Sequence, residues 1–154
     1  MGERRKKENI LRVFSAGGVV FKKEDNKTYF LLIKPAKTDR WQFPKGLIDK
    51  GESTLETALR EVEEEGGVKA EVVKKLGASS YFFVWEGEKI FKTVTYFLMK
   101  YLKDTGDGHD GEVEKVLFAP FAEAYEKLTY KDDKNFLKKA KEILERGIQN
   151  HLMR

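Results

Sequence analysis

Apolar and polar residues alternate, or apolar residues run together, over several stretches that predict β-strands. Residues typical of turns separate these stretches, including Glu24 to Lys27 and Glu86 to Glu88. We expect the first two strands to form a hairpin. The stretch 90–102 is apolar on both faces, which is typical of a central strand covered on both sides. The predicted strands are residues 12–23, 28–33, 69–77, 80–85, 90–102 and 112–119.

A helical period replaces the alternation in the middle and at the end of the chain. An apolar stripe spaced i, i+3, i+4 and i+7 predicts a helix over residues 54–65, and its members are Leu55, Ala58, Leu59 and Val62. Ser53 or Thr54 is expected to cap the start of this helix, and a residue of Gly66-Gly67 to end it in the left-handed conformation. From Phe121 onwards, two further apolar stripes predict closing helices.

Two features of the predicted strands have more than one interpretation. Gly17 and Gly18 lie in the middle of the first strand, where they allow the backbone to approach either a ligand or a neighbouring strand. Aromatic residues are dense in the later strands, and alternation favours a place in the core over a ligand platform for most of them. These aromatic residues are Tyr81, Phe82, Phe83, Trp85, Phe91, Tyr96 and Phe97.

Length and composition are those of one globular domain, since the chain has 154 residues, of which 40% are hydrophobic and 36% charged. We expect residues 1–9 to be a flexible basic arm and residues 10–150 a single domain. The absence of cysteine excludes disulfide and thiolate chemistry. No apolar run is long enough to cross a membrane and the N-terminus has no signal-peptide core, which predicts a cytoplasmic protein. Nothing in the sequence indicates an oligomeric state.

The net charge of +4 is spread along the chain and interleaved with acidic residues. This distribution favours solubility over nucleic-acid binding, and a basic rim that attracts polyphosphate is the sharper alternative. His109 lies in a turn-rich segment, residues 104–111, which we expect to be a flexible, solvated loop without the spacing of a calcium site.

Carboxylates gather on one side of the predicted 54–65 helix. Glu61, Glu64 and Glu65 lie about 115° from the apolar stripe if each residue turns the helix by ~100°. Three such groups repel one another, and a hard divalent cation such as Mg²⁺ or Mn²⁺ removes the repulsion. Arg60 is spaced to fold back and grip Glu52 bidentately. A solvated acidic helix face is the plainer reading of these glutamates.

The whole stretch 46–68 has a more specific pattern. Gly46 is followed after five residues by Glu52, and after seven more by Arg60-Glu61-Val62, Glu64-Glu65 and Gly67-Val68. This pattern resembles the Nudix box with every defined position filled. The resemblance covers residues 10–145 and implies the Nudix fold, a mixed β-sheet sandwiched between α-helices in the α/β (α+β) class. Gly66 stands where relatives often have threonine, at a position that the box does not constrain.

The Nudix resemblance implies metal-dependent hydrolysis of a nucleoside diphosphate linked to another group. It implies that metal is held by Glu61, Glu64 and Glu65, with the Gly46 carbonyl and, from a later strand, Glu112. Glu52 would orient Arg60. The general base would be Glu64 or Glu112, because family members differ on this role.

Segments outside the box resemble one group of proteins within the Nudix family. SAGGVVF, WQFPKG, GEKIFKTVTYFLMKY and LTYKDDKNFLKKA are similar to bacterial and archaeal diadenosine tetraphosphate hydrolases, although PKG also occurs in diphosphoinositol polyphosphate hydrolases. This similarity implies asymmetric cleavage to ATP and AMP. Lys45 and Lys92 would bind phosphates, and Tyr130 would clamp adenine against Tyr81 or Phe83.

Other substrates and one other class of function stay open at this point. The alternative substrates are diphosphoinositol polyphosphates, ADP-ribose, oxidised nucleoside triphosphates and the 5′-pyrophosphate of RNA. A non-catalytic, nucleotide-sensing Nudix module is the alternative outside the enzymes. Such a module is expected to lose carboxylates of the box, and none is missing here.

Overall fold

The computed structural model describes residues 9–106 and 111–152. Residues 1–8 of the predicted arm and His109 of the predicted loop lie outside the described residues. No helix in the described part of the chain is both long enough and apolar enough to span a membrane.

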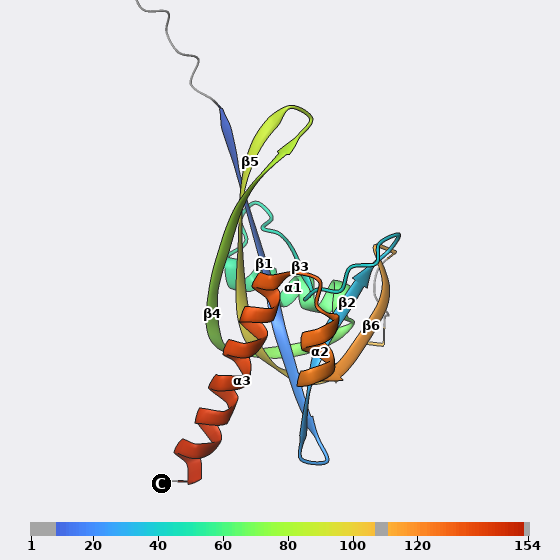
Figure 1. Ribbon diagram of the computed structural model, residues 1–154, viewed down its shortest axis with the longest axis vertical. Helices are drawn as coiled ribbons and strands as arrows, with labels where there is room; N and C mark the ends of the chain where they lie inside the picture. The colour runs from blue at the N-terminus through green and yellow to red at the C-terminus, as the bar shows by residue number, and fades with distance from the viewer. Residues whose placement is uncertain (1–8, 107–110, 153–154) are drawn as a thin grey trace, which may run out of the picture.

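One mixed sheet forms the centre of the molecule (Figure 1). Its strand order is β4-β5-β1-β2-β6, and the short β3 pairs with β1. β1 and β5 run parallel, whereas the other neighbouring pairs are antiparallel. The strands are β1 (Ile10–Glu24), β2 (Lys27–Pro35), β3 (Lys45–Leu47), β4 (Val68–Trp85), β5 (Glu88–Asp104) and β6 (Val113–Pro120).

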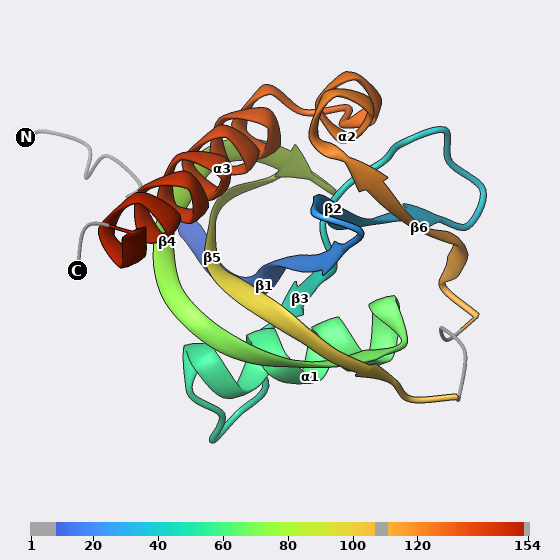
Figure 2. The same ribbon diagram turned by 90° about the horizontal axis from the view of Figure 1, so that it is seen from below.

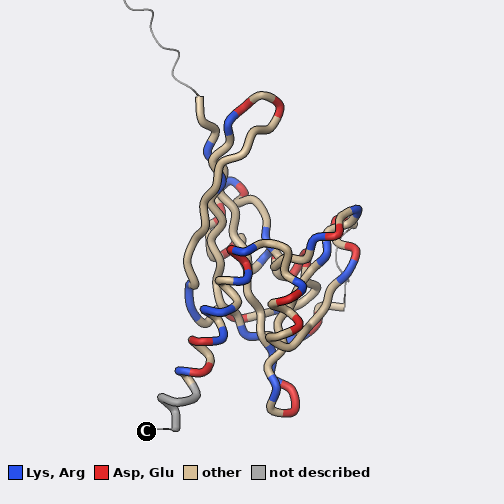
Figure 3. The backbone as a smooth tube through the Cα atoms, viewed as in Figure 1, with Lys and Arg blue, Asp and Glu red and all other residues tan. Residues whose placement is uncertain are grey.

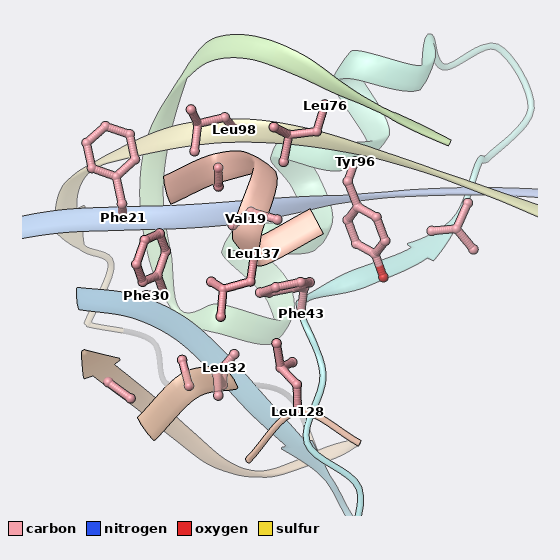
Figure 4. Close-up of a cluster of buried hydrophobic side chains, with 14 residues drawn as sticks. Val19, Phe21, Phe30, Leu32, Phe43, Leu76, Tyr96, Leu98, Leu128 and Leu137 are labelled. Carbon is pink, nitrogen blue, oxygen red and sulfur yellow. The ribbon is translucent and has the colours of Figure 1, made fainter. Parts of the chain in front are cut away.

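Helices cover both faces of this sheet (Figure 2). α1 (Thr54–Gly66) packs on one face, where Ala58 and Val62 join a buried cluster with strand residues. α2 (Phe121–Lys127) and α3 (Lys131–Leu152) cover the other face through a second cluster, shown in Figure 4. The two clusters share the sheet between them, as the Nudix resemblance predicted. β5 contributes side chains to both, so its predicted place as a covered central strand is confirmed.

Two tight turns join neighbouring antiparallel strands. Asp25 and Asn26 have φ of 52° and 64°, and Glu86 and Gly87 have φ of 49° and 78°. Two successive positive φ values are the conformation that matches the right-handed twist of a two-residue hairpin. The predicted hairpin of β1 and β2 is therefore confirmed.

Neighbouring segments of the same chain account for the two glycines in β1. A Cβ at Gly17 would lie 2.2 Å from the Pro44 carbonyl oxygen, and a Cβ at Gly18 would lie 2.6 Å from Val62 Cγ2. The Gly18 N–H also donates to the Pro44 carbonyl at 3.1 Å. The close approach is thus to the chain that leads into β3 and to α1.

The sequence interpretation was wrong about one strand boundary and one helix residue. The predicted strands 69–77 and 80–85 form one strand, β4, whose pairing with β5 continues through three register irregularities. Backbone pairing along β5 overrides the local signals that separated them. Leu55, in the first turn of α1, is 39% exposed, whereas Ala58 and Val62 of the same predicted stripe are buried.

The aromatic residues of β4 also depart from the expected core. Phe82 and Trp85 are 62% and 63% exposed. They lie near the end of the β4–β5 hairpin, which projects beyond the helices in Figure 1. Tyr96 and Phe97 in the covered part of β5 are buried, as expected. The alternating sequence pattern correctly predicted that these aromatic residues lie on strands. The end of the hairpin is exposed because the helices do not cover it.

Candidate functional site

The site begins with α1, whose two ends are capped as predicted. Ser53 is the N-cap, and its hydroxyl accepts from the Glu56 N–H at 3.0 Å while the Glu56 carboxylate accepts from the Ser53 N–H at 3.1 Å. At the other end, Gly67 takes the left-handed conformation with φ of 69°. These caps satisfy backbone groups that a helix leaves unpaired, so they set where the acidic face of α1 begins and ends.

The box pattern does not define Gly66, but packing restricts it. It is buried, and a Cβ there would lie 2.7 Å from Leu31 Cδ2 of β2.

Arg60 ties the loop before α1 to the helix. Its Nε donates to Glu52 Oε2 at 2.8 Å and its Nη2 to Glu52 Oε1 at 2.9 Å, which is the predicted bidentate contact. The Thr57 hydroxyl donates to the same carboxylate at 2.8 Å. The Arg60 contact, followed by that of Thr57, lowers the pKa of Glu52 to about 2. Arg60 also reaches the Leu47 carbonyl at 3.2 Å, so the clamp holds the end of β3 as well.

The carboxylates of α1 lie around the same guanidinium and β3. Arg60 Nη1 lies 2.8 Å from Glu61 Oε1 and 3.1 Å from Glu64 Oε2. Glu65 Oε1 accepts from the Lys45 backbone N–H at 2.7 Å. Glu61 and Glu64 thus share the Arg60 guanidinium, whereas Glu65 contacts the backbone of β3. In the part of the chain that the structure describes, no three acidic, histidine or cysteine side chains are grouped closely enough to hold a metal ion.

The chemistry of these groups fits a hard divalent cation. Gly46 lies against Glu61, since a Cβ on Gly46 would be 2.2 Å from the Glu61 carboxyl carbon, so any other residue would fill this space. The oxygen donors available are the carboxylates of Glu61, Glu64 and Glu65 and the Gly46 carbonyl. Such an all-oxygen set suits Mg²⁺ or Mn²⁺.

A cavity of about 800 Å³ opens beside β3 and the acidic helix. Strand alternation and register explain its floor, because side chains two residues apart face the same side. β3 contributes Lys45 and Leu47, and β1 contributes Ser15 between them and β5. Lys92, Val94 and Tyr96 follow along β5, and Ser79, Tyr81 and Phe83 along β4.

The cavity brings together all five residues that the sequence proposed for substrate binding. Lys45, Lys92, Tyr81, Phe83 and Tyr130 all line it, as do Gly46, Glu65 and Glu112. Glu112 immediately precedes β6, where its carbonyl accepts from the Ala36 N–H at 2.9 Å. Glu52, Arg60, Glu61 and Glu64 are not part of the lining and flank it through β3 and α1.

Burial changes the charge balance of the two cavity lysines. The pKa of Lys45 is lowered by burial, against the opposing charges of Asp133 and Glu65. The pKa of Lys92 is lowered by burial and then by the neighbouring charge of Lys45. Two amino groups held close together and partly out of water form a strong attractor for a polyanion.

Tyr130 is fixed at the opening of the cavity. Arg40 Nη1 donates to its hydroxyl at 3.1 Å, and the ring is 40% exposed. Tyr81 and Phe83 line the same cavity, with ring centroids 6.0 Å apart. Three residues thus bring flat aromatic surface to one cavity.

Asp133, Tyr96 and Arg40 are among the cavity residues that sequence reasoning missed. Asp133 is only 5% exposed, and burial raises its pKa to about 6. The Tyr96 hydroxyl, itself buried, hydrogen-bonds with its carboxylate. Arg40 completes the set through its contact with Tyr130. Asp133 looked like an ordinary acidic residue in a helix first turn, and Tyr96 like a core aromatic, so only the three-dimensional contact reveals the pair.

Comparison with known proteins agrees with this fold. Residues 11–140 match the NUDIX domain model, so the chain belongs to the Nudix family, which is a family of pyrophosphohydrolases. A Mycobacterium tuberculosis protein that is named as the mutator protein MutT4 is 37% identical over 106 residues. The match covers 69% of this chain and 43% of that protein. The RNA pyrophosphohydrolase of Pelagibacter ubique is 32% identical over 63% of this chain and 64% of its own length. The rat asymmetrical bis(5′-nucleosyl)-tetraphosphatase is 41% identical over 49% of this chain and 53% of its own. The chain thus spans less than two thirds of each of these relatives.

Solved structures show the same architecture. A binary complex of the Caenorhabditis elegans Ap4A hydrolase superposes with a TM-score of 0.71 at 25% identity, covering 86% of this chain and 98% of that one. The NUDIX domain of Shewanella oneidensis NrtR, complexed with ADP ribose, superposes with a TM-score of 0.68 at 21% identity over 86% and 88% of the two chains. The second likeness concerns the fold alone.

Proposed function

We propose that this protein hydrolyses diadenosine tetraphosphate asymmetrically to ATP and AMP. The observation that carries the proposal is a single cavity that joins two partly buried lysines and flat aromatic surfaces to the box residues Gly46 and Glu65. Lysines suit a chain of phosphates, and aromatic faces suit a nucleobase. The similarity to the rat tetraphosphatase and the nematode Ap4A hydrolase supports this choice of substrate.

Each group of residues has a distinct task in the proposed reaction. Lys45 and Lys92 bind the phosphate chain, and Tyr130 with Tyr81 or Phe83 holds an adenine. The Arg60–Glu52 clamp keeps the loop and the end of β3 in register with α1. Glu64 or Glu112 accepts the proton of the attacking water.

A divalent cation, Mg²⁺ or Mn²⁺, would be held by Glu61, Glu64, Glu65 and the Gly46 carbonyl, and Glu112 would be a further ligand. When bound, it would screen phosphate charge and make water a better nucleophile. Around it, the protein holds these oxygen donors through the Arg60 contacts with Glu61 and Glu64 and the Lys45 contact with Glu65.

A substrate panel tests the proposal. The panel contains diadenosine tetraphosphate, ADP-ribose, an oxidised nucleoside triphosphate, a diphosphoinositol polyphosphate and a 5′-triphosphorylated RNA, each with Mg²⁺. We expect the highest kcat/KM for diadenosine tetraphosphate. A higher kcat/KM for another member would leave the assignment to the pyrophosphohydrolases in place and change the proposed substrate. Absence of turnover for every member would contradict catalysis and favour a nucleotide-sensing module.

Tyr130 separates nucleotide from inositol substrates. Replacing Tyr130 by Leu removes the stacking face, and base–aromatic stacking is worth about 1–3 kcal/mol. The variant should therefore raise KM for diadenosine tetraphosphate about tenfold while leaving any turnover of a diphosphoinositol substrate unchanged. An unchanged KM for the dinucleotide would remove Tyr130 from the proposed clamp.

A further inference from the structure

The end of the β4–β5 hairpin and the start of β1 form a three-stranded arm that extends beyond the helices (Figure 1). Residues 80–85 of β4 lie opposite residues 88–93 of β5, and residues 10–14 of β1 pair along the other side of β5. Large apolar residues dominate the exposed surface of this arm. Those outside the cavity lining are 39–67% exposed, and they are Ile10, Leu11, Phe14, Phe82, Val84 and Trp85.

Four of these residues lie on one face of the arm, on the side opposite the cavity. Residues aligned across paired strands share a side of the sheet. The register aligns Phe82 with Phe91, and their ring centroids are 4.6 Å apart. Tyr81 and Lys92, which line the cavity, alternate with these two residues and so face the other side. The register also aligns Ile10 and Val84 with Lys89, and Phe14 with Thr93.

The exposed apolar area of this face is close to what a stable protein interface requires. Aromatic side chains bury about 150–250 Å² each when fully covered, so the four residues at their observed exposures present about 400 Å². A standard interface covers about 800 Å² of each partner and is about 60% apolar, which is about 450–500 Å². The partly buried Phe91 adds further apolar area at the centre of the face.

Protein fits this face better than nucleic acid does. Aromatic rings beside Arg12 and Lys89 have the composition of a stacking platform for bases. However, the Arg12 guanidinium carbon already lies 5.3 Å from the Phe91 ring centroid, and Glu86 and Glu88 at the end of the arm repel phosphates. An apolar centre with both signs of charge around it is typical of a protein interface.

The charges at the two ends of the face are complementary to those of a second copy of the chain. Lys75 is exposed at the base of the arm, on the same side as the face, because it aligns with Phe97 of the cluster beneath α1. Glu86 lies in the turn at the other end. Two arms that pack antiparallel bring the Lys75 end of one copy towards the Glu86 end of the other, and two-fold symmetry repeats this contact.

We propose that this face of the arm is a dimer interface, in which the arms of two copies of the chain pack face to face and antiparallel about a two-fold axis. The four exposed apolar residues and Phe91 form its centre, and the charged residues at the two ends form its rim. The inference goes beyond the proposed function and does not rest on it, because the face lies on the side of the arm opposite the cavity.

Sedimentation velocity of the wild-type protein without substrate tests the inference first. We expect a dimer at about 50 μM, since interfaces of this size have dissociation constants of about micromolar or below. A monomer at this concentration would overturn the proposal and leave the face to a different kind of partner.

A charge at the centre of the face should separate the two copies. Phe82→Lys should raise the dissociation constant of the dimer about 10²- to 10³-fold, because each substitution counts twice in a two-fold interface. Leu102→Lys is the matched control, since Leu102 is 52% exposed on β5 outside the arm, and it should remain a dimer. Val84→Lys, at a residue that is 67% exposed, repeats the test if Phe82→Lys lowers the folded content seen by circular dichroism. Dimers of equal strength in the arm variants and the control would contradict this interface.

Chemical crosslinking tests whether the faces of two copies meet. The chain has no cysteine, so one introduced thiol reports on one position. Packed sheets lie about 10 Å apart, which exceeds the reach of a disulfide, so a short bismaleimide is the suitable reagent. Ser80→Cys places an exposed thiol on the face and should give a covalent dimer, whereas Leu102→Cys should not. Equal crosslinking of both variants would mean that the contact is not specific to this face.

Reversal of the end charges tests the antiparallel arrangement. Glu86→Lys and Lys75→Glu should each weaken the dimer about threefold or more at low salt, which is the scale of exposed ion pairs made twice. The variant that carries both substitutions should regain the wild-type dissociation constant, because the opposite charges meet again across the interface. A double variant that is weaker than either single variant would contradict the antiparallel packing of the arms.

Discussion

Individual glutamates on α1 differ in what surrounds them, although the sequence presents them as one run. Glu61 and Glu64 face Arg60, Glu65 holds the β3 backbone, and Glu63 pairs with Lys69 at 3.0 Å. Glu63 thus pairs with β4, whereas Glu61 and Glu64 contact Arg60 and Glu65 contacts β3. This difference provides a matched pair of substitutions.

Glu64→Gln should leave the fold intact and lower kcat by about 10²- to 10⁴-fold, because general acid–base groups contribute on this scale. Glu63→Gln on the same helix is the control and should retain wild-type turnover. Steady-state kinetics and circular dichroism of both variants make the comparison. Wild-type turnover in Glu64→Gln would refute the role assigned to Glu64 and leave Glu112 as the candidate base.

Asp133 also predicts a pH dependence of stability. Its pKa is raised from 3.8 to about 6 in the folded state, so the fold favours the protonated form. The penalty is absent below about pH 4, grows as the pH rises to about 6, and is constant above that. At pH 8, Asp133→Asn should therefore be more stable than wild type by roughly 3 kcal/mol, since one pKa unit corresponds to about 1.4 kcal/mol.

Chemical denaturation at pH 8 and at pH 3.5 measures this difference. The two proteins should have nearly equal free energies of unfolding at the lower pH. A variant that is less stable than wild type at pH 8 would contradict the burial cost assigned to the carboxylate.

Among the elements, α1 could be predicted most completely and β4 least. The start, the end and the acidic face of α1 follow from local signals: the Ser53 cap, the Gly67 left-handed residue and the helical spacing of the glutamates. The Arg60–Glu52 contact followed from spacing within the same segment. Local sequence determines these features because every partner lies within a few turns of chain.

Features that depend on distant segments could not be predicted in the same way. Leu31 of β2 constrains Gly66, and β5 pairing makes one strand of β4. Asp133 and Tyr96 are brought together from α3 and β5, far apart in sequence. The cavity residues Lys45, Lys92 and Tyr130 were proposed from a family resemblance, and only the folded sheet places them around one opening.

The capping box of α1 gives a prediction for this element. Ser53→Ala removes the side-chain acceptor for the Glu56 N–H and should lower the free energy of unfolding by about 1 kcal/mol. Ser80→Ala is a suitable control, because Ser80 is exposed and its hydroxyl is hydrogen-bonded to the Thr93 hydroxyl on the neighbouring strand, away from α1. Urea denaturation of both variants measures the difference. Equal stability of Ser53→Ala and wild type would mean that the cap does not limit unfolding.

At the scale of the whole molecule, charged residues are spread along the chain, whereas the candidate site residues lie close together in space. Figure 3 shows basic and acidic residues mixed along the described chain, as expected from the sequence. The cavity instead gathers Lys45 and Lys92 beside the acidic helix. The sheet, the end of α1 and the first turn of α3 all contribute residues to this cavity, where we propose that substrate, cation and water come together.

The most direct test of the account is hydrolysis of diadenosine tetraphosphate with Mg²⁺ in ¹⁸O-labelled water, with products resolved by chromatography and mass spectrometry. We expect ATP and AMP with the label in AMP, because water attack at the phosphorus nearest one adenosine leaves its oxygen on that fragment. Formation of two ADP molecules, or label in ATP, would contradict the proposed point of attack. Absence of turnover for this compound and for every other phosphoanhydride in the panel would contradict the assignment as an active pyrophosphohydrolase.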